Sequence, residues 1–260
     1  MAYERILFEV DGGVATLTLN HPGTRNALSW KLAEEMGDAL GRLGDARALV
    51  IAGAGKGFCS GGDMTSAVAD GQGFGDMLFD GIVGQVNPML EQLQALEIPV
   101  ICAVNGAAAG AGAPLALSAD FTICGESAFF YFAFPNVGLA LDVGASWLLP
   151  RLIGTARASE ALMLAERIPA AKALDWGMVY KVVPDDDLAA EAQALARRLA
   201  AGPTRAYGLI RRTLRHGWSS TYTAALVAEA EAQRAAGNSA DCAEAVDAFL
   251  TKRAPVFRGV

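Results

Sequence analysis

Hydrophobic and polar positions follow two different periods near the start of the chain. Residues 5–20 alternate β-branched and polar side chains around Asp11-Gly12-Gly13, a turn sequence that tolerates positive φ, which predicts a β-hairpin. Residues 26–43 then switch to a helical period. The apolar residues on the predicted helical stripe are Leu32, Met36, Leu40 and Leu43.

Short apolar runs alternate with helical segments over the next hundred residues. The runs ALVIAG (48–53), PVICAVNG (99–106) and FTICG (121–125) are typical of buried strands, and helical patterns cover 83–96 and 110–120. Strands that alternate with helices indicate an α/β core in which part of the sheet is parallel.

The pattern changes after Pro203, where only helical segments remain. Residues 203–217, 219–237 and 239–253 read as three helices separated by Gly, Ser and Pro. We therefore predict an α/β core over residues 1–200 and a helical region over 201–260. Because so small a region buries little apolar surface alone, we expect it to pack on the core or on another subunit.

Composition excludes several classes of function. The chain has 260 residues, a net charge of −7 and an isoelectric point near 4.9, which argues against general nucleic-acid binding. No secretion signal opens the sequence and no apolar run is long enough to cross a bilayer, so we expect a cytoplasmic protein without a membrane partner. The four cysteines lack disulfide or zinc spacing, so no metal is expected.

Two glycine-rich turns leave the ends of predicted strands, AGKGFCSGGDM (54–64) and AAAGAGAPLAL (107–117). Side by side, they could direct two peptide N–H groups at one oxygen and form an oxyanion hole. The alternative is that the glycines only permit tight packing. The turns lack the spacing of a phosphate-binding loop, and no GxSxG motif is present. Cys59 is either a nucleophile or a buried small residue.

One carboxylate, Asp142, lies in an apolar and glycine-rich stretch, GLALDVGAS (138–146). Desolvation there should raise the pKa of Asp142 and make its ionised form a stronger base. The alternative is that Asp142 caps the helix predicted after it.

The chain resembles the crotonase superfamily, the enoyl-CoA hydratase/isomerase family, over essentially its whole length. The matching segments, in the family's order, are NHPGTRNALS (20–29), GAGKGFCSGGDM (53–64), PVICAVNGAAAGAGAPLALSADFTICGESAFF (99–130), GASWLLPRLIG (144–154), ALDWGMVYKVVP (173–184) and AFLTKRAPVF (248–257). The resemblance implies a spiral of ββα units that binds acyl-CoA and a C-terminal helical region that forms a homotrimer or a dimer of trimers. It implies no cofactor other than the coenzyme A of the substrate.

The resemblance also assigns catalytic roles. The N–H groups of Gly62 and Ala111 correspond to those that hold the thioester oxygen. Where the hydratases of the family carry two glutamates, this chain has Pro114 and Phe134, which cannot transfer a proton, so efficient hydration is disfavoured. Asp142 is similar to the aspartate of the isomerase branch, and one base that takes and returns a proton suffices to shift a double bond.

Further positions are implied for binding of the substrate and its coenzyme A. They are Arg25, Ala27, Lys56, Ser60, Gly61, Asp63, Met64, Gly110, Phe134 and, toward a neighbouring subunit, Lys252. Arg25 and Lys56 could equally be solvated surface charges. The segment 64–81 and nearby aromatic residues would shape the acyl pocket.

Two other functions stay open at this point. One is another reaction of the family, such as hydration, hydrolysis or ring chemistry with Asp142 activating water. The other is a catalytically silent acyl-CoA binder. The sequence does not identify the acyl group.

Overall fold

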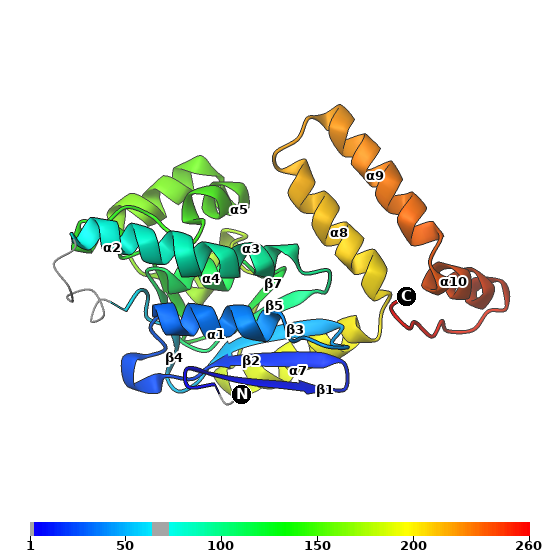
Figure 1. The fold of residues 1–260 in the computed structure, drawn as a ribbon, viewed down its shortest axis with the longest axis horizontal. Helices are drawn as coiled ribbons and strands as arrows, with labels where there is room; N and C mark the ends of the chain where they lie inside the picture. The colour runs from blue at the N-terminus through cyan, green and yellow to red at the C-terminus, as the bar shows by residue number, and fades with distance from the viewer. Residues whose placement is uncertain (1–2, 64–72) are drawn as a thin grey trace.

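The computed structural model describes residues 3–63 and 73–260 (Figure 1). The strands are β1 (Ile6–Asp11), β2 (Val14–Leu19), β3 (Ala48–Gly53), β4 (Gly57–Cys59), β5 (Val100–Val104), β6 (Ala107–Ala109), β7 (Phe121–Gly125), β8 (Phe129–Tyr131), β9 (Ile168–Pro169) and β10 (Lys181–Val183). The α-helices are α1 (Trp30–Leu40), α2 (Phe74–Gly81), α3 (Asn87–Ala95), α4 (Gly112–Leu117), α5 (Ala145–Ser159), α6 (Ala170–Asp175), α7 (Leu188–Ala200), α8 (Thr204–Gly217), α9 (Tyr222–Gly237) and α10 (Ala240–Leu250). Shorter 3₁₀ or π segments are η1 (Pro22–Thr24), η3 (Ile82–Val86), η4 (Phe134–Val137), η5 (Glu160–Leu164) and η6 (Asp185–Asp187).

Two sheets organise the core. The larger has the order β1-β2-β3-β5-β7-β10 and the smaller β4-β6-β8-β9. Within the larger sheet β1 and β2 form an antiparallel hairpin, and the remaining neighbours are parallel. The hairpin and the partly parallel sheet predicted from the sequence are confirmed.

The chain repeats one unit as it moves between the sheets. A strand of the larger sheet is followed by a strand of the smaller sheet and then by a helical segment, as in β3-β4-α2, β5-β6-α4 and β7-β8-η4. This repetition is the predicted spiral of ββα units, and it is confirmed. The hydrophobic pattern does not predict β6, because its three alanines have low strand propensity and directly precede a segment with a helical pattern.

Alternate residues of the central strands face two separate apolar layers. Leu49 and Ile51 of β3 contact the larger core beneath α1 and α3, whereas Ala48 and Val50 face α7 on the other side. The period of two along a strand and the helices on both faces explain why these strands read as continuous apolar runs.

Helix α1 begins at Trp30, later than the helical pattern that starts at residue 26, because Ser29 caps it by accepting a hydrogen bond from the Leu32 N–H at 3.2 Å. The four residues of its predicted stripe are all buried.

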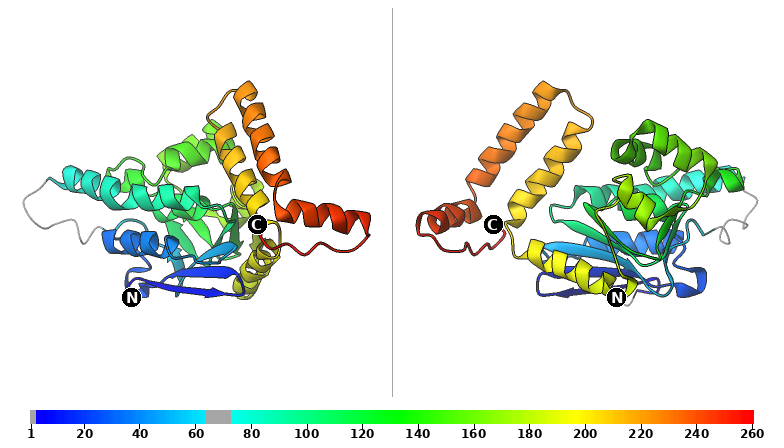
Figure 2. Two further views of the ribbon diagram at one scale, coloured as in Figure 1. Left: turned by 45° about the vertical axis from the view of Figure 1, so that its right-hand side comes forward. Right: turned by 180° about the vertical axis from the view of Figure 1, so that it is seen from behind.

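The last three helices stand beside the core (Figures 1 and 2). Helices α8 and α9 run side by side, and α10 lies beyond them. Arg211 joins α8 to the core, because its Nε donates to Asp120 Oδ2 at 2.5 Å and its guanidinium also bonds the Leu96 carbonyl. The change of architecture falls between Ala200, the end of α7, and Thr204, the start of α8. That residues 1–200 and 201–260 act as two units stays a prediction. Among the residues described, no helix is both long enough and apolar enough to cross a membrane.

Candidate active site

The two glycine-rich turns lie against each other. Strands β4 and β6 are parallel neighbours, with Gly57 opposite Ala107, so the turns that follow them leave the same edge of the smaller sheet. A Cβ on Gly61 would lie 3.1 Å from the carbonyl oxygen of Ala109 and 3.4 Å from Cα of Gly110. Gly61 has φ +103° and Gly110 has φ +48°, conformations that favour glycine. The close contact of the two backbones therefore requires glycine.

This contact places two unused peptide donors together. Leu28 N–H donates to the Gly61 carbonyl at 2.7 Å and Asp63 N–H donates to the Leu28 carbonyl at 3.1 Å, so the Gly62 N–H between them is left out of the bridge. Ala111 immediately precedes α4, where N–H groups have no acceptor within the helix. Over residues 3–63 and 73–260 neither N–H has a hydrogen-bond acceptor.

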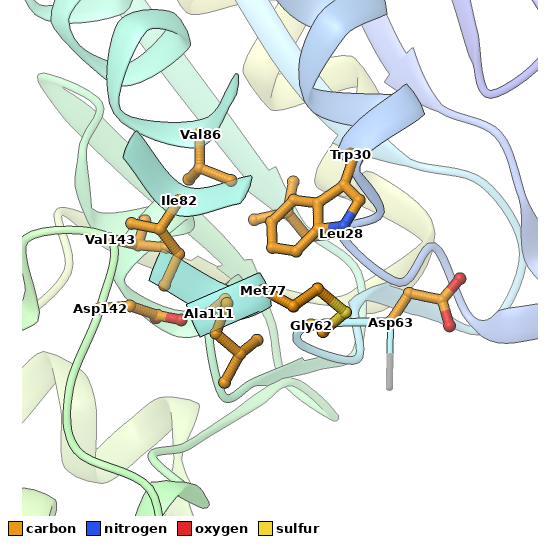
Figure 3. Close-up of a pocket in the computed structure, with 11 residues that line it drawn as sticks. Leu28, Trp30, Gly62, Asp63, Met77, Ile82, Val86, Ala111, Asp142 and Val143 are labelled. Atoms are coloured by element: carbon orange, nitrogen blue, oxygen red, sulfur yellow. The ribbon is translucent and has the colours of Figure 1, made fainter. Parts of the chain in front are cut away.

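A cavity of about 40 Å³ is lined by both of these residues (Figure 3). Its wall is otherwise largely apolar and comes from the start of α1, from α2 and η3, and from the segment before α5. The lining residues are Leu28, Trp30, Gly62, Asp63, Met77, Leu78, Ile82, Val86, Ala111, Asp142 and Val143. The three residues predicted to be catalytic, Gly62, Ala111 and Asp142, are thus brought together in one cavity.

The carboxylate of Asp142 points toward Ala111, whereas that of Asp63 points away from the other labelled residues (Figure 3). Oδ1 of Asp142 is buried and has no hydrogen-bond partner in the part of the chain that is described. Helix α5 begins after Gly144 without a side-chain cap; only the backbone carbonyl of Asp142 takes part, accepting from the Ala145 N–H at 3.0 Å. The alternative that Asp142 caps this helix is therefore wrong.

Burial raises the pKa of Asp142 from 3.8 to about 6, and a hydrogen bond from its own backbone N–H lowers it by less. The apolar wall supplies no compensating charge, so desolvation dominates. A carboxylate with such a pKa is ionised at neutral pH and is a stronger base than an exposed aspartate.

Asn26 holds this arrangement together, and sequence reasoning had not singled it out. Its side chain is fully buried; Nδ2 donates to the carbonyls of Ala54, Gly57 and Phe58 at 2.9 to 3.1 Å, and Oδ1 accepts from the His21 N–H at 2.9 Å. Its φ of +58° is one that Asn tolerates better than most residues. Asn26 thus fixes residues 26–28 against β4, which positions Gly61 and Gly62.

Several predicted coenzyme-binding residues gather at the rim of the site. Ser60 Oγ donates to the Thr24 carbonyl at 2.8 Å, and Ser60 N–H donates to the Arg25 carbonyl at 3.0 Å. Arg25, Lys56 and Ser60 are exposed, whereas Ala27 is buried beside them. Both cations are therefore exposed to solvent, where an anionic ligand could reach them.

Among the other predicted residues, Phe134 and Lys252 lie away from the cavity. Phe134 is 6% exposed and packs in the core without lining the cavity, because it begins the 3₁₀ turn η4 and its side chain joins the apolar cluster. Lys252 follows α10, which lies on the other side of the molecule from β4 (Figures 1 and 2). Met64 lies outside the residues that the structure describes.

The apolar walls of the cavity were mostly missed from the sequence. Of the aromatic and methionine residues expected near the acyl group, Met77 lines the cavity, whereas Phe130 and Phe132 are core. Trp30 was not expected there. It reaches the cavity because α2 has a glycine, Gly81, against its ring, where any Cβ would overlap the indole. No periodic pattern could have revealed that pairing.

Comparison with known proteins gives a consistent result. Residues 9–260 match the family model described as enoyl-CoA hydratase/isomerase. The chain is 43% identical over 259 residues to the 1,2-epoxyphenylacetyl-CoA isomerase of Escherichia coli (strain K12), covering 98% of this chain and 99% of that protein. It is 41% identical over 260 residues to a "Probable enoyl-CoA hydratase" of Rhodobacter capsulatus, covering 100% of both.

A solved structure extends the similarity to three dimensions. The crystal structure of an enoyl-CoA hydratase from Polaromonas sp. JS666 superimposes with a TM-score of 0.92 at 34% sequence identity, covering 97% of this chain and 99% of that chain.

Proposed function

Because the chain belongs to the enoyl-CoA hydratase/isomerase family of acyl-CoA enzymes, we propose that it isomerises an enoyl-CoA or a related acyl-CoA with Asp142 as acid and base. The observation that carries this proposal is Asp142, whose buried Oδ1 lies in the cavity that also holds the N–H groups of Gly62 and Ala111, all three without a hydrogen-bond partner among residues 3–63 and 73–260.

The proposed reaction moves one proton. The thioester oxygen of the substrate accepts hydrogen bonds from the Gly62 and Ala111 N–H groups. The Asp142 carboxylate removes a proton from the acyl chain, and the electron pair of that C–H bond delocalises onto the thioester oxygen to give a dienolate. Asp142, now protonated, returns the proton to a different carbon, so the double bond moves and the enzyme is regenerated.

The two N–H groups contribute where the negative charge develops. Donors preorganised in a site that excludes water stabilise an oxyanion strongly; loss of one such donor costs on the order of 3 kcal/mol in other enzymes. Because both donors are backbone groups at turns fixed by glycine contacts, they need little reorganisation during the reaction.

Hydration is the second candidate, and the name of the Rhodobacter capsulatus relative favours it. Water addition needs a group that positions water and a group that delivers a proton. Of the two carboxylates labelled in Figure 3, only Asp142 points into the cavity, and the hydratase positions are occupied by Pro114 and Phe134, both buried. A single base fits a proton shift better than the addition of water.

For binding, we propose that Arg25, Lys56 and Ser60 at the exposed rim contact the phosphates of coenzyme A, with Ala27, Gly61 and Asp63 beside them. Lys252 would serve the site of a neighbouring subunit in a homotrimer or a dimer of trimers, since α10 projects away from the site of its own chain (Figure 2). No further cofactor is required by this chemistry.

The test replaces the base and keeps its shape. In Asp142→Asn we expect turnover of 3-hexenoyl-CoA to fall by roughly 10²- to 10⁴-fold, because the amide cannot accept the proton. The affinity for hexanoyl-CoA should change little, since Asp142 is not placed on the coenzyme. Asp38→Asn, an exposed carboxylate on α1, is the matched control and should retain full turnover.

Product analysis by mass separates the alternatives. An isomer of unchanged mass supports the proposal, and a product heavier by one water from crotonyl-CoA would favour hydration. Binding of acyl-CoA without any product would identify a silent binder. Equal turnover by Asp142→Asn and the parent would contradict the role of Asp142.

A further inference from the structure

One residue separates the candidate active site from a second cavity. Val143 lines the cavity that holds Asp142, and it also lines a neighbouring cavity of about 230 Å³ between α3 and the start of α5. The second cavity has an apolar side formed by Leu90, Trp147 and Leu148. Val143 itself is 3% exposed and is the residue that the two linings have in common.

The backbone of Val143 is held in an unusual conformation. Its φ is +50°, in the left-handed region, where a β-branched residue is a rare exception, and Gly144 follows with φ +71°. A non-glycine residue in this region costs on the order of 1 to 3 kcal/mol and persists where the surroundings fix it. Here the Val143 side chain packs in the core beside Ile82 (Figure 3), while the preceding side chain, Asp142, enters the cavity.

The other walls of the active-site cavity differ in stiffness. The cavity of about 40 Å³ is small, so an acyl group that enters it contacts these walls. Met77 has an unbranched, flexible side chain that can adopt other rotamers. Val143 is β-branched, buried and fixed on a constrained backbone, so it is less able to move than Met77.

We propose that Val143 is a specificity-determining residue that ends the acyl pocket and restricts the enzyme to short or compact acyl groups. This inference rests on the proposed acyl-CoA isomerase function. The second cavity is then the space that a longer acyl tail would occupy if the side chain of Val143 were removed.

The test is a change in chain-length selectivity. In Val143→Ala, the ratio of kcat/KM for 3-dodecenoyl-CoA to that for 3-hexenoyl-CoA should rise roughly tenfold or more, since each methylene buried in an apolar pocket contributes about 1 kcal/mol or more. Val143→Gly relieves the left-handed strain as well and should show the same shift. Leu148→Ala is the matched control: it removes apolar volume from the second cavity alone, and its ratio should equal that of the parent.

A double variant tests the route of the tail. Leu90→Trp in the Val143→Ala background fills the second cavity and should return the ratio to the parental value. An unchanged ratio in folded Val143→Ala and Val143→Gly would overturn the proposal, as would an equal gain in Leu148→Ala. Failure of both Val143 variants to fold while Leu148→Ala folds would identify a purely structural residue and overturn it too.

Binding keeps this test separate from the proposed reaction. The ratio of Kd values for dodecanoyl-CoA and hexanoyl-CoA, measured by calorimetry, should shift in the same direction, although neither saturated ligand can react. If the parent isomerises no enoyl-CoA but this ratio shifts in Val143→Ala, the proposed reaction is wrong and the role of Val143 as the end of the acyl pocket is supported. If the parent isomerises enoyl-CoA but the ratio of Kd values is the same in Val143→Ala, the proposed reaction is supported and the role of Val143 is contradicted.

Discussion

At the scale of single residues, the site depends on a carboxylate that is placed where its charge is poorly solvated. Asp142 contributes a buried oxygen that has no hydrogen-bond partner among residues 3–63 and 73–260, and the pKa near 6 follows from desolvation. The same environment that would make Asp142 the proposed base should weaken the fold when the carboxylate is ionised.

We therefore expect ionisation of Asp142 to reduce the free energy of unfolding, with the full reduction reached above pH 6. Its pKa is 3.8 in an unfolded chain and about 6 in the folded protein. Below pH 3.8 both states are protonated and the residue has no effect. Between pH 4 and 6 only the unfolded state loses the proton, so the free energy of unfolding falls as pH rises and stays low above 6. The full difference is about 3 kcal/mol.

Urea denaturation of Asp142→Asn at two pH values measures this effect. At pH 8 the variant should be more stable than the parent by up to about 3 kcal/mol, and the difference should shrink toward zero near pH 4. A variant that is equally or less stable at pH 8 would contradict the buried and unpaired carboxylate.

At the scale of elements, the proposed oxyanion site is a product of strand pairing. Parallel β4 and β6 bring Gly61 and Gly110 into backbone contact, and Asn26 ties the chain before α1 to the same strand. The donors on Gly62 and Ala111 are therefore fixed by packing between segments about 50 residues apart in the sequence.

Gly61→Ala should disrupt this contact. Its Cβ would press on the Ala109 carbonyl at 3.1 Å, and φ +103° is unfavourable for alanine. We expect a loss of about 1 to 3 kcal/mol in the free energy of unfolding, measured by chemical denaturation. Gly62→Ala is the matched control for stability, because no atom of the described residues 3–63 and 73–260 lies within 4 Å of its Cβ position and its φ is not positive. Similar losses in both variants would contradict the role given to the turn contact.

At the scale of the whole molecule, the C-terminal helices expose an apolar surface that the core does not cover. Exposed apolar side chains on and between α8, α9 and α10 are Ile210, Leu214, Trp218, Tyr222, Leu226, Val227, Val246, Phe249 and Leu250. Exposure of this many large apolar side chains on a projecting region is typical of an interface. The proposed homotrimer would bury part of this surface.

Phe249→Asp should weaken the proposed assembly. Phe249 is 82% exposed, so the charge should not disturb the fold of one chain, but it would be buried without a partner in an interface. We expect sedimentation velocity to show a shift from the parental oligomer toward monomer. Leu7→Asp, on exposed β1 of the core, is the control and should keep the parental mass. An oligomer unaffected by Phe249→Asp would place the interface elsewhere.

Local signals in the sequence were sufficient to predict many of the helices and strands of this molecule. The hairpin at 5–20, the stripe on α1 and the buried runs of β3, β5 and β7 follow from hydrophobic period and turn chemistry, which act between near neighbours. The ordered motifs led to the family, and with it to the spiral fold and to Gly62, Ala111 and Asp142 as candidates.

Tertiary structure alone decided what surrounds those candidates. That Asp142 enters a cavity instead of capping α5, that Asn26 secures the turns, and that Trp30 and Val143 form walls all depend on contacts between segments far apart in the chain. Hydrophobic periodicity does not reveal such contacts, because a residue that lines a cavity and a residue in the core are equally apolar. The sequence by itself determined which chemistry is present, and the packing of distant elements determined the space in which that chemistry can act.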